Sequence, residues 1–251
     1  MKNTILSKLE EIEEKEKVHI IHAVESGSRA WGFESPDSDY DVRFIYVRPA
    51  EYYLRLDDTR DVIEWQLDET LDINGWDIQK MLRLLYKSNP TVFEWNNSPI
   101  VYKTTPQWQK ISSVINDYFI SKHGIYHYLS TAKGNYREYL KGEEVRLKKY
   151  FYVLRPLLAC RWIIDRDCPP PMLFEELTAA YLPQDIRPAV DSLLEIKMHS
   201  PETKTGKRIK ELNDYIEKSF EEMESLAAAA SDSSDRSWDT LNRVFLETIG
   251  L

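Results

Sequence analysis

The sequence predicts an α+β fold in which a small α/β domain, residues 1–105, is followed by a helical domain, residues 106–251. All of the strand-like segments lie before about residue 105. From Pro106 onward the apolar residues recur at helical spacing with only short breaks, and no internal repeat is visible in either half. A chain of 251 residues is long enough for one substantial core or two small ones, so two domains are expected.

The first elements predicted are a helix and two strands. The N-terminal segment places Ile5, Leu9 and Ile12 among many Glu and Lys residues, which is typical of an amphipathic surface helix. Two apolar runs, residues 18–24 and 42–47, predict strands. A tight Gly-Ser turn and a short helix are expected between them.

The turn is formed by Gly27 and Ser28. Because glycine has no Cβ, the chain can turn sharply there, and successive backbone N–H groups and the Ser28 hydroxyl can converge on phosphate oxygens. Arg29 follows directly and could reach the γ-phosphate or point into water. A Gly-Ser pair alone is usually an ordinary turn, so the interpretation depends on the residues that follow it.

Two aspartates open the second strand. Alternation places Asp39, Asp41 and Arg43 on one face, and Val42 and Phe44 on the face that a sheet would bury. Carboxylates at this spacing can bridge two Mg²⁺ ions, with Mn²⁺ as a substitute, and an NTP would supply further oxygen ligands. Arg43 could contact the triphosphate or form a salt bridge with one of the aspartates. The turn and the aspartates together predict nucleotidyl transfer.

A third carboxylate is expected on a neighbouring strand. Residues 61–67 and 70–76 read as a hairpin, and Asp72 lies in the middle of its second strand. Asp77 is the alternative, but it directly precedes the helical pattern of residues 78–85 and suits an N-cap. The sequence therefore favours Asp72 and leaves Asp77 open.

These residues resemble the signature of the DNA polymerase beta-like nucleotidyltransferase superfamily, which is Gly-Ser, a spacer, Asp-x-Asp and a later carboxylate. A narrower resemblance, over most of residues 18–175, is to bacterial predicted nucleotidyltransferases, some of them associated with RNA-repair ligases. The motifs that carry it are Gly-Ser-Arg-Ala-Trp-Gly-Phe from residue 27, Gly75-Trp76-Asp77, Asn89-Pro90, Glu94-Trp95, Ser98-Pro99-Ile100-Val101-Tyr102 and Leu147-Lys148-Lys149-Tyr150.

The resemblance implies a small mixed β-sheet nucleotidyltransferase domain with flanking helices and two Mg²⁺ ions. A hydroxyl would attack the α-phosphate of an NTP, such as ATP, and pyrophosphate would leave. In this mechanism Gly27 and Ser28 hold the β- and γ-phosphates, Asp39 and Asp41 bridge the two metals, and Asp72 holds the catalytic one. The acceptor stays open between an RNA end, a small molecule and a protein hydroxyl. The alternative is a non-catalytic nucleotide-binding or antitoxin-like regulatory module.

The helical half offers one further candidate for nucleotide binding. Lys148, Tyr152 and Arg155 recur at i, i+4 and i+7, so one helix face could present two phosphate-binding cations beside a stacking ring. A solvated helix face explains the same residues equally well. Later, apolar residues at positions 209, 212, 216, 220 and 223 predict a packed helix. Residues 227–235 are expected to form a linker, although the four alanines at 227–230 could prolong the preceding helix.

Composition limits the partners and the compartment. A net charge of −9 argues against broad electrostatic capture of nucleic acid. Cys160 and Cys168 have no metal-ligand pattern around them, and neither a signal peptide nor a membrane-spanning run is apparent. A cytoplasmic protein with no membrane partner is therefore expected.

Overall fold

The computed structural model describes residues 1–68, 70–200, 204–230, 232 and 236–251. By contacts, the chain divides into two compact units. The first unit consists of Met1–Ala30, Asp39–Tyr118 and Ser234–Leu251, and the second of Trp31–Ser38 and Phe119–Ser233.

The first unit contains a five-stranded sheet of order β3-β4-β2-β1-β5. Its strands are β1 (His19–Glu25), β2 (Tyr40–Val47), β3 (Val62–Asp68), β4 (Leu71–Asp77) and β5 (Val101–Thr104). The pair β2–β4 is parallel and the other neighbours are antiparallel. The small mixed sheet that the resemblance implied is therefore confirmed, as is the α+β fold class.

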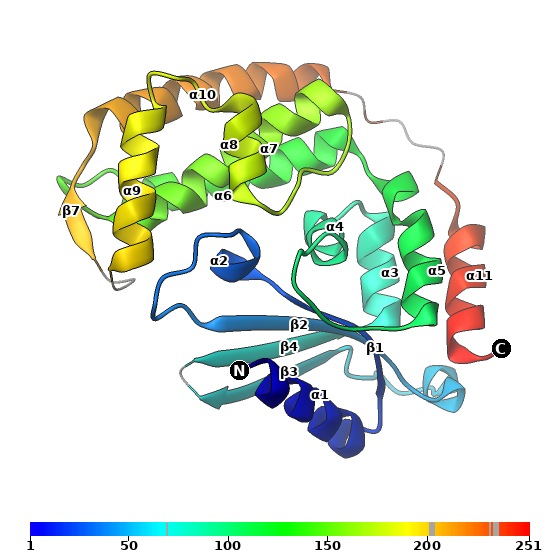
Figure 1. Cartoon of the computed structure of the whole chain (residues 1–251). Coiled ribbons are helices and arrows are strands. Elements are labelled where there is room, and N and C mark those ends of the chain that lie inside the picture. Colours follow the sequence, from blue (N-terminus) through cyan, green and yellow to red (C-terminus); the bar gives the residue numbers. More distant parts are fainter. Residues whose placement is uncertain (69, 201–203, 231, 233–235) are drawn as a thin grey trace. The chain divides into compact units, whose positions relative to one another are not determined.

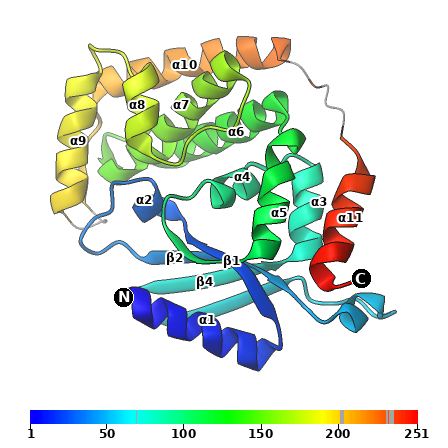
Figure 2. The same cartoon turned by 45° about the vertical axis from the view of Figure 1, so that its right-hand side comes forward.

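Helices cover both faces of this sheet (Figures 1 and 2). The helices of this unit are α1 (Lys2–Glu16), α2 (Gly27–Ala30), α3 (Ile78–Tyr86), α4 (Pro90–Asn96), α5 (Pro106–Ile115) and α11 (Trp238–Ile249). It also contains the 3₁₀ turns η1 (Ala50–Leu54) and η2 (Asn116–Tyr118). On one face, α1 buries Ile5, Leu9 and Ile12 against residues such as Phe44 and Ile73, which confirms its predicted amphipathic character. On the other, α3 contacts β2 and β4, α5 contacts β1, and α11 contacts α3 and α5.

The second unit is built mainly from helices. They are α6 (Ser121–Tyr139), α7 (Phe151–Arg166), α8 (Phe174–Tyr181), α9 (Arg187–His199) and α10 (Lys210–Ala229), with the 3₁₀ turn η3 (Leu147–Tyr150). Two short antiparallel strands, β6 (Glu144–Arg146) and β7 (Thr205–Lys207), complete it. Helix α7 contacts α6, α8 and α10, and its residues from Val153 to Cys160 are all buried. Four residues of the predicted apolar stripe, at positions 212, 216, 220 and 223 of α10, are buried in the same core, and Ile209, the N-cap of α10, is partly buried against it.

The two units are interleaved along the chain. Residues 106–118 and α11 belong to the unit with the sheet, and Trp31–Ser38 belong to the helical unit. The division at residue 105 stays a prediction about domains. Strands β5, β6 and β7 were not predicted. Helix α10 continues through Ala229, so the alanines prolong the helix, as the alternative allowed, and the linker prediction is wrong there. Residues 231 and 233–235 of that segment lie outside the described residues. Over the described part of the chain, no helix has the length and apolar character needed to cross a membrane.

Candidate active site

The Gly27 turn and Asp41 lie in direct contact. Strand β1 ends at Glu25 and α2 begins at Gly27, where φ is +59°, a left-handed value that favours glycine. A Cβ on Gly27 would lie 2.1 Å from Asp41 Oδ2, so only glycine leaves room for that carboxylate. The Ser26 amide donates to the Asp41 carbonyl at 2.8 Å, and Ser28 is buried at the start of the short helix. The predicted order of strand, turn, short helix and strand is confirmed.

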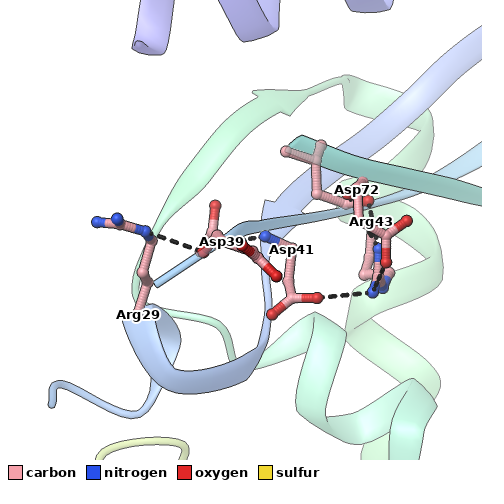
Figure 3. A network of polar contacts seen from close by, with 7 residues as sticks. Arg29, Asp39, Asp41, Arg43 and Asp72 are labelled. Atoms are coloured by element: carbon pink, nitrogen blue, oxygen red, sulfur yellow. Dashed lines mark hydrogen bonds and ion pairs between the residues drawn. The ribbon is translucent and has the colours of Figure 1, made fainter. Parts of the chain in front are cut away.

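Asp41 and Asp72 are register partners on parallel strands. In the β2–β4 ladder, Asp41 lies opposite Asp72. Neighbours on adjacent strands project to the same face, and Val42 and Phe44 are buried on the opposite one. Asp39 is exposed and directly precedes β2. Figure 3 shows the three aspartates around this end of the sheet.

Arg43 bridges two of these carboxylates (Figure 3). Its Nη2 lies 2.9 Å from Asp41 Oδ1 and 2.8 Å from Asp72 Oδ2, and its Nη1 donates to the Asp72 carbonyl at 3.1 Å. The side chain of Asp72 is 53% exposed, so these pairs contribute little to stability. They matter for the charge of the site, because the Arg43 guanidinium neutralises part of the negative charge of the Asp41 and Asp72 carboxylates. Two roles were considered for Arg43, contact with a triphosphate and a salt bridge with an aspartate. The structure shows the salt bridge, with Asp41.

The donor chemistry of this cluster fits a divalent cation. Mg²⁺ prefers carboxylate oxygens, which Asp39, Asp41 and Asp72 all offer. The guanidinium of Arg43 also shows that a positive group can lie between Asp41 and Asp72. Among the residues that the structure describes, no three His, Cys, Asp or Glu side chains are arranged as a ready-made metal site. Metal binding therefore stays a prediction based on donor type.

Arg29 holds the main chain next to Asp39. Its Nε donates to the Asp39 carbonyl at 3.1 Å, and its guanidinium lies 3.7 Å from the centroid of the Tyr40 ring. These contacts place Arg29 beside the start of β2. A role for Arg29 in nucleotide binding remains a prediction.

Glu25 is a site residue that sequence reasoning missed. Its side chain is fully buried, Oε1 accepts a 2.7 Å hydrogen bond from the Asp41 amide, and Oε2 accepts one from the Tyr102 hydroxyl. Burial raises the pKa of the Glu25 carboxyl, against the lowering effect of these two donors. Glu25 thus positions the main chain of Asp41. A carboxylate ending an otherwise apolar strand, directly before the turn, was the available signal.

Asp77 has a separate, structural task. It is the N-cap of α3, as its place in the sequence predicts: Oδ1 accepts from the Gln79 amide at 2.8 Å. Oδ2 accepts from the Tyr53 hydroxyl at 3.0 Å. The side chain is buried, and burial raises the pKa of its carboxyl to about 6. In the ladder Asp77 lies opposite Tyr46, at the far end of β2 from Asp41, so the register favours Asp72 as the third carboxylate.

Lys148, Tyr152 and Arg155 do not share one continuous α-helix. Lys148 lies in η3, whereas Tyr152 and Arg155 lie in α7. Arg155 is 2% exposed; its guanidinium lies 4.7 Å from the Trp31 ring, and its Nε donates to the Met172 carbonyl at 3.4 Å. The Tyr152 ring meets Trp31 edge-on at 5.3 Å. Nucleotide binding by these three residues stays a prediction.

The mixed sheet, the Gly-Ser turn and the facing aspartates together have the form of a polymerase beta-like nucleotidyltransferase. Residues 1–247 match the model of the RNA repair pathway DNA polymerase beta family, and the chain belongs to that family. It is 42% identical to the uncharacterized protein YcgL of Bacillus subtilis (strain 168), over 99% of this chain and 96% of that protein. The resemblance drawn from the motifs is confirmed.

A comparison with solved structures found a nucleotidyltransferase-like protein from Exiguobacterium sibiricum 255-15. It is 12% identical to this chain, with a TM-score of 0.29, and the match covers 97% of this chain and 79% of that one.

Proposed function

We propose that the protein is a Mg²⁺-dependent nucleotidyltransferase that moves an NMP from an NTP to a hydroxyl acceptor and releases pyrophosphate. The observation that carries this proposal is the position of Asp41. Its carboxylate lies against the Gly27 turn, and its register partner on the parallel strand is Asp72. A phosphate-binding turn and an acidic pair are thereby adjacent, in a chain of a polymerase beta family.

Each residue has a proposed role in binding or positioning. The backbone of Gly27 and the hydroxyl of Ser28 bind the β- and γ-phosphates. Asp39, Asp41 and Asp72 would hold the two Mg²⁺ ions through their carboxylate oxygens. When bound, these ions neutralise the triphosphate and lower the pKa of the attacking hydroxyl. Glu25 keeps the Asp41 main chain in place, and Arg43 balances Asp41 and Asp72.

An RNA end is the first acceptor to examine, because the family is described as part of an RNA repair pathway. The net charge of −9 limits non-specific attraction to RNA, so recognition would depend on local contacts. Small molecules and protein hydroxyls are the other acceptor classes.

A non-catalytic nucleotide-binding module, for example an antitoxin-like regulator, is the second candidate. The observation that favours it is the bridging guanidinium of Arg43, which lies between two carboxylates that metal binding would require. Such a module would bind an NTP in calorimetry but would release no pyrophosphate with any acceptor.

The direct test is incubation with each α-labelled NTP and Mg²⁺ or Mn²⁺, alone and with total RNA or cell extract. Transfer of label identifies the acceptor and the nucleotide together. The variant Asp41→Asn should abolish metal-dependent pyrophosphate release while keeping the native circular dichroism spectrum. Turnover by Asp41→Asn at the wild-type rate would remove Asp41 from the proposed site.

A further inference from the structure

The segment Trp31–Ser38 joins the two halves of the nucleotidyltransferase motif. It begins directly after α2, which contains Gly27 and Ser28, and it ends directly before Asp39. Although both neighbours belong to the unit with the sheet, this segment folds with the helical unit. The Phe174 amide donates to the Trp31 carbonyl at 3.0 Å, and Phe33 is buried with its ring 4.9 Å from that of Phe151.

Lys197 holds the second half of this segment. It lies in α9 and is only 5% exposed, and its Nζ donates to Ser35 Oγ at 3.0 Å and approaches Ser38 Oγ at 3.4 Å. The two serine hydroxyls are 2.8 Å apart, and Ser38 Oγ also accepts from the Ser35 amide at 2.9 Å. An ammonium group is costly to remove from water unless hydrogen bonds compensate it. Its burial against this turn therefore favours one conformation of the turn.

The turn from Ser35 to Ser38, which Lys197 contacts, is followed directly by Asp39. Ser38 is buried and its amide donates to the Ser35 carbonyl at 3.1 Å, so the main chain is ordered up to the residue before Asp39. On the other side, Arg29 Nε binds the Asp39 carbonyl. Arg29 thus contacts the main chain at Asp39, and Lys197 contacts the side chain of Ser38, the residue before it.

We propose that Lys197 is a positioning residue for Asp39. It acts through Ser35 and Ser38 and contacts neither nucleotide nor metal. This inference rests on the proposed function, because it takes Asp39 to be a ligand of the divalent cation. Loss of Lys197 should weaken metal binding without altering the ligand set, as loss of supporting contacts around metal ligands typically does by ten- to a hundredfold.

The test compares Mn²⁺ affinity, measured by isothermal titration calorimetry with a non-hydrolysable NTP analogue, in the full-length wild type, four single variants and one double variant. Lys197→Met removes the charge at similar length, and Ser38→Ala removes its hydroxyl acceptor with little change in volume. Both should weaken Mn²⁺ binding about tenfold. Ile216→Val, a mild change in the buried face of α10, is the control for a general loss of stability in the helical unit and should leave the affinity unchanged.

The fourth variant, Asp39→Asn, separates positioning from a general structural effect. The double variant Asp39→Asn/Lys197→Met should bind Mn²⁺ no more weakly than Asp39→Asn alone, because the effect of Lys197 on metal binding depends on Asp39. Independently of metal, Lys197→Met should speed hydrogen exchange at the Ser35 and Ser38 amides at least tenfold, with no such change in Ile216→Val.

Different outcomes overturn different statements. If the wild type binds Mn²⁺ but Lys197→Met leaves its affinity unchanged, or weakens it equally with and without Asp39, the positioning role is wrong and the proposed function is unaffected. If exchange at Ser35 and Ser38 is unaltered by Lys197→Met, the positioning role is likewise wrong. If the wild type binds neither Mn²⁺ nor NTP, the proposed function fails and the role of Lys197 toward a metal ligand fails with it.

Discussion

Asp72 and Asp77 lie on the same strand, and their surroundings assign them different tasks. Asp72 is about half exposed and binds Arg43 beside Asp41, whereas Asp77 is buried and caps α3. We expect Asp72→Asn to lower metal-dependent pyrophosphate release by at least a hundredfold, because a neutral amide is a much weaker Mg²⁺ ligand. Asp77→Asn is the matched control: asparagine retains the acceptor for the Gln79 amide, so activity should persist. Equal losses in both variants would contradict this assignment.

The Asp77 carboxyl also gives the protein a specific dependence of stability on pH. Its pKa is raised from 3.8 to about 6 in the folded protein, mainly by burial. Because the folded state binds the proton more tightly, this group favours folding most below about pH 4, and the benefit is lost as pH rises to about 6. A shift of this size corresponds to about 3 kcal/mol.

Asp77→Asn should remove the contribution of this carboxyl to the pH dependence of stability, since asparagine carries no charge at any of these pH values. Its free energy of unfolding, measured in urea, should exceed that of the wild type above pH 6 and approach it near pH 4. The comparison must be between variants because His22 acts in the opposite direction: burial lowers its pKa to about 4, so its protonation destabilises the fold as pH falls from 6.5. A difference that does not change with pH would show that the Asp77 carboxyl titrates normally.

At the scale of elements, β4 has a glycine, Gly75, where it lies opposite Phe44 of β2. A Cβ on Gly75 would lie 2.1 Å from the Phe44 ring, which is buried under α1. Gly75→Ala should therefore overpack this core and lower the free energy of unfolding by about 1–3 kcal/mol. Gly134 in α6 is the control, because a Cβ there meets no atom within 4 Å and alanine in a helix should stabilise by about 0.5–1 kcal/mol. A neutral Gly75→Ala would show that Phe44 moves freely.

Elements with a strong local pattern were predictable from the sequence. The helix with Ile5, Leu9 and Ile12, the strand ending in Val47 and the N-cap at Asp77 each depend on neighbours in the chain. Strands β5, β6 and β7 were missed because three or four residues carry too little periodicity, and their pairing partners are distant in sequence. A strand of that length is recognised only by its ladder.

The residues of the candidate site also differ in whether a local sequence pattern could predict them. Gly27, Asp41 and Asp72 follow from a turn, a strand period and a hairpin, all of them local features. Glu25 had a local signal, as the carboxylate that ends an apolar strand. Its hydrogen bond with Tyr102 and the contact of Lys197 with Ser35 could not be predicted, because these partners are distant in sequence and meet only in the folded chain. For Arg155 the spacing predicted one helix face shared with Lys148 and Tyr152, and the sequence did not predict its burial against Trp31. Nucleotide binding by Arg155 stays a prediction.

At the scale of the whole molecule, the C-terminal helix completes the unit that contains the sheet. Trp238 stacks on Tyr86 with ring centroids 3.8 Å apart, the Tyr118 hydroxyl donates to the Ser237 carbonyl at 2.7 Å, and Leu241 is buried. A chain ending at residue 230 loses these contacts. Its thermal midpoint should fall by roughly 10 °C, given the apolar burial that is removed.

The control for this truncation is Leu246→Ala, which changes an exposed residue of the same helix and should leave the midpoint within about 2 °C. Differential scanning calorimetry would resolve the affected transition. An unchanged midpoint in the truncated chain would mean that α11 is dispensable for the sheet.

The return of α11 to the first unit also sets an order of events during synthesis. A ribosome releases β1 to β5 before most of the helical unit, and it releases α11, which contacts α3 and α5, after that unit. Because domains tend to fold as they emerge, the helical unit can fold before α11 is released, whereas α3 and α5 wait for that helix with the residues that it contacts uncovered. The unit with the sheet therefore begins to emerge before the helical unit and is completed after it, and a chaperone would have most reason to bind it in that interval.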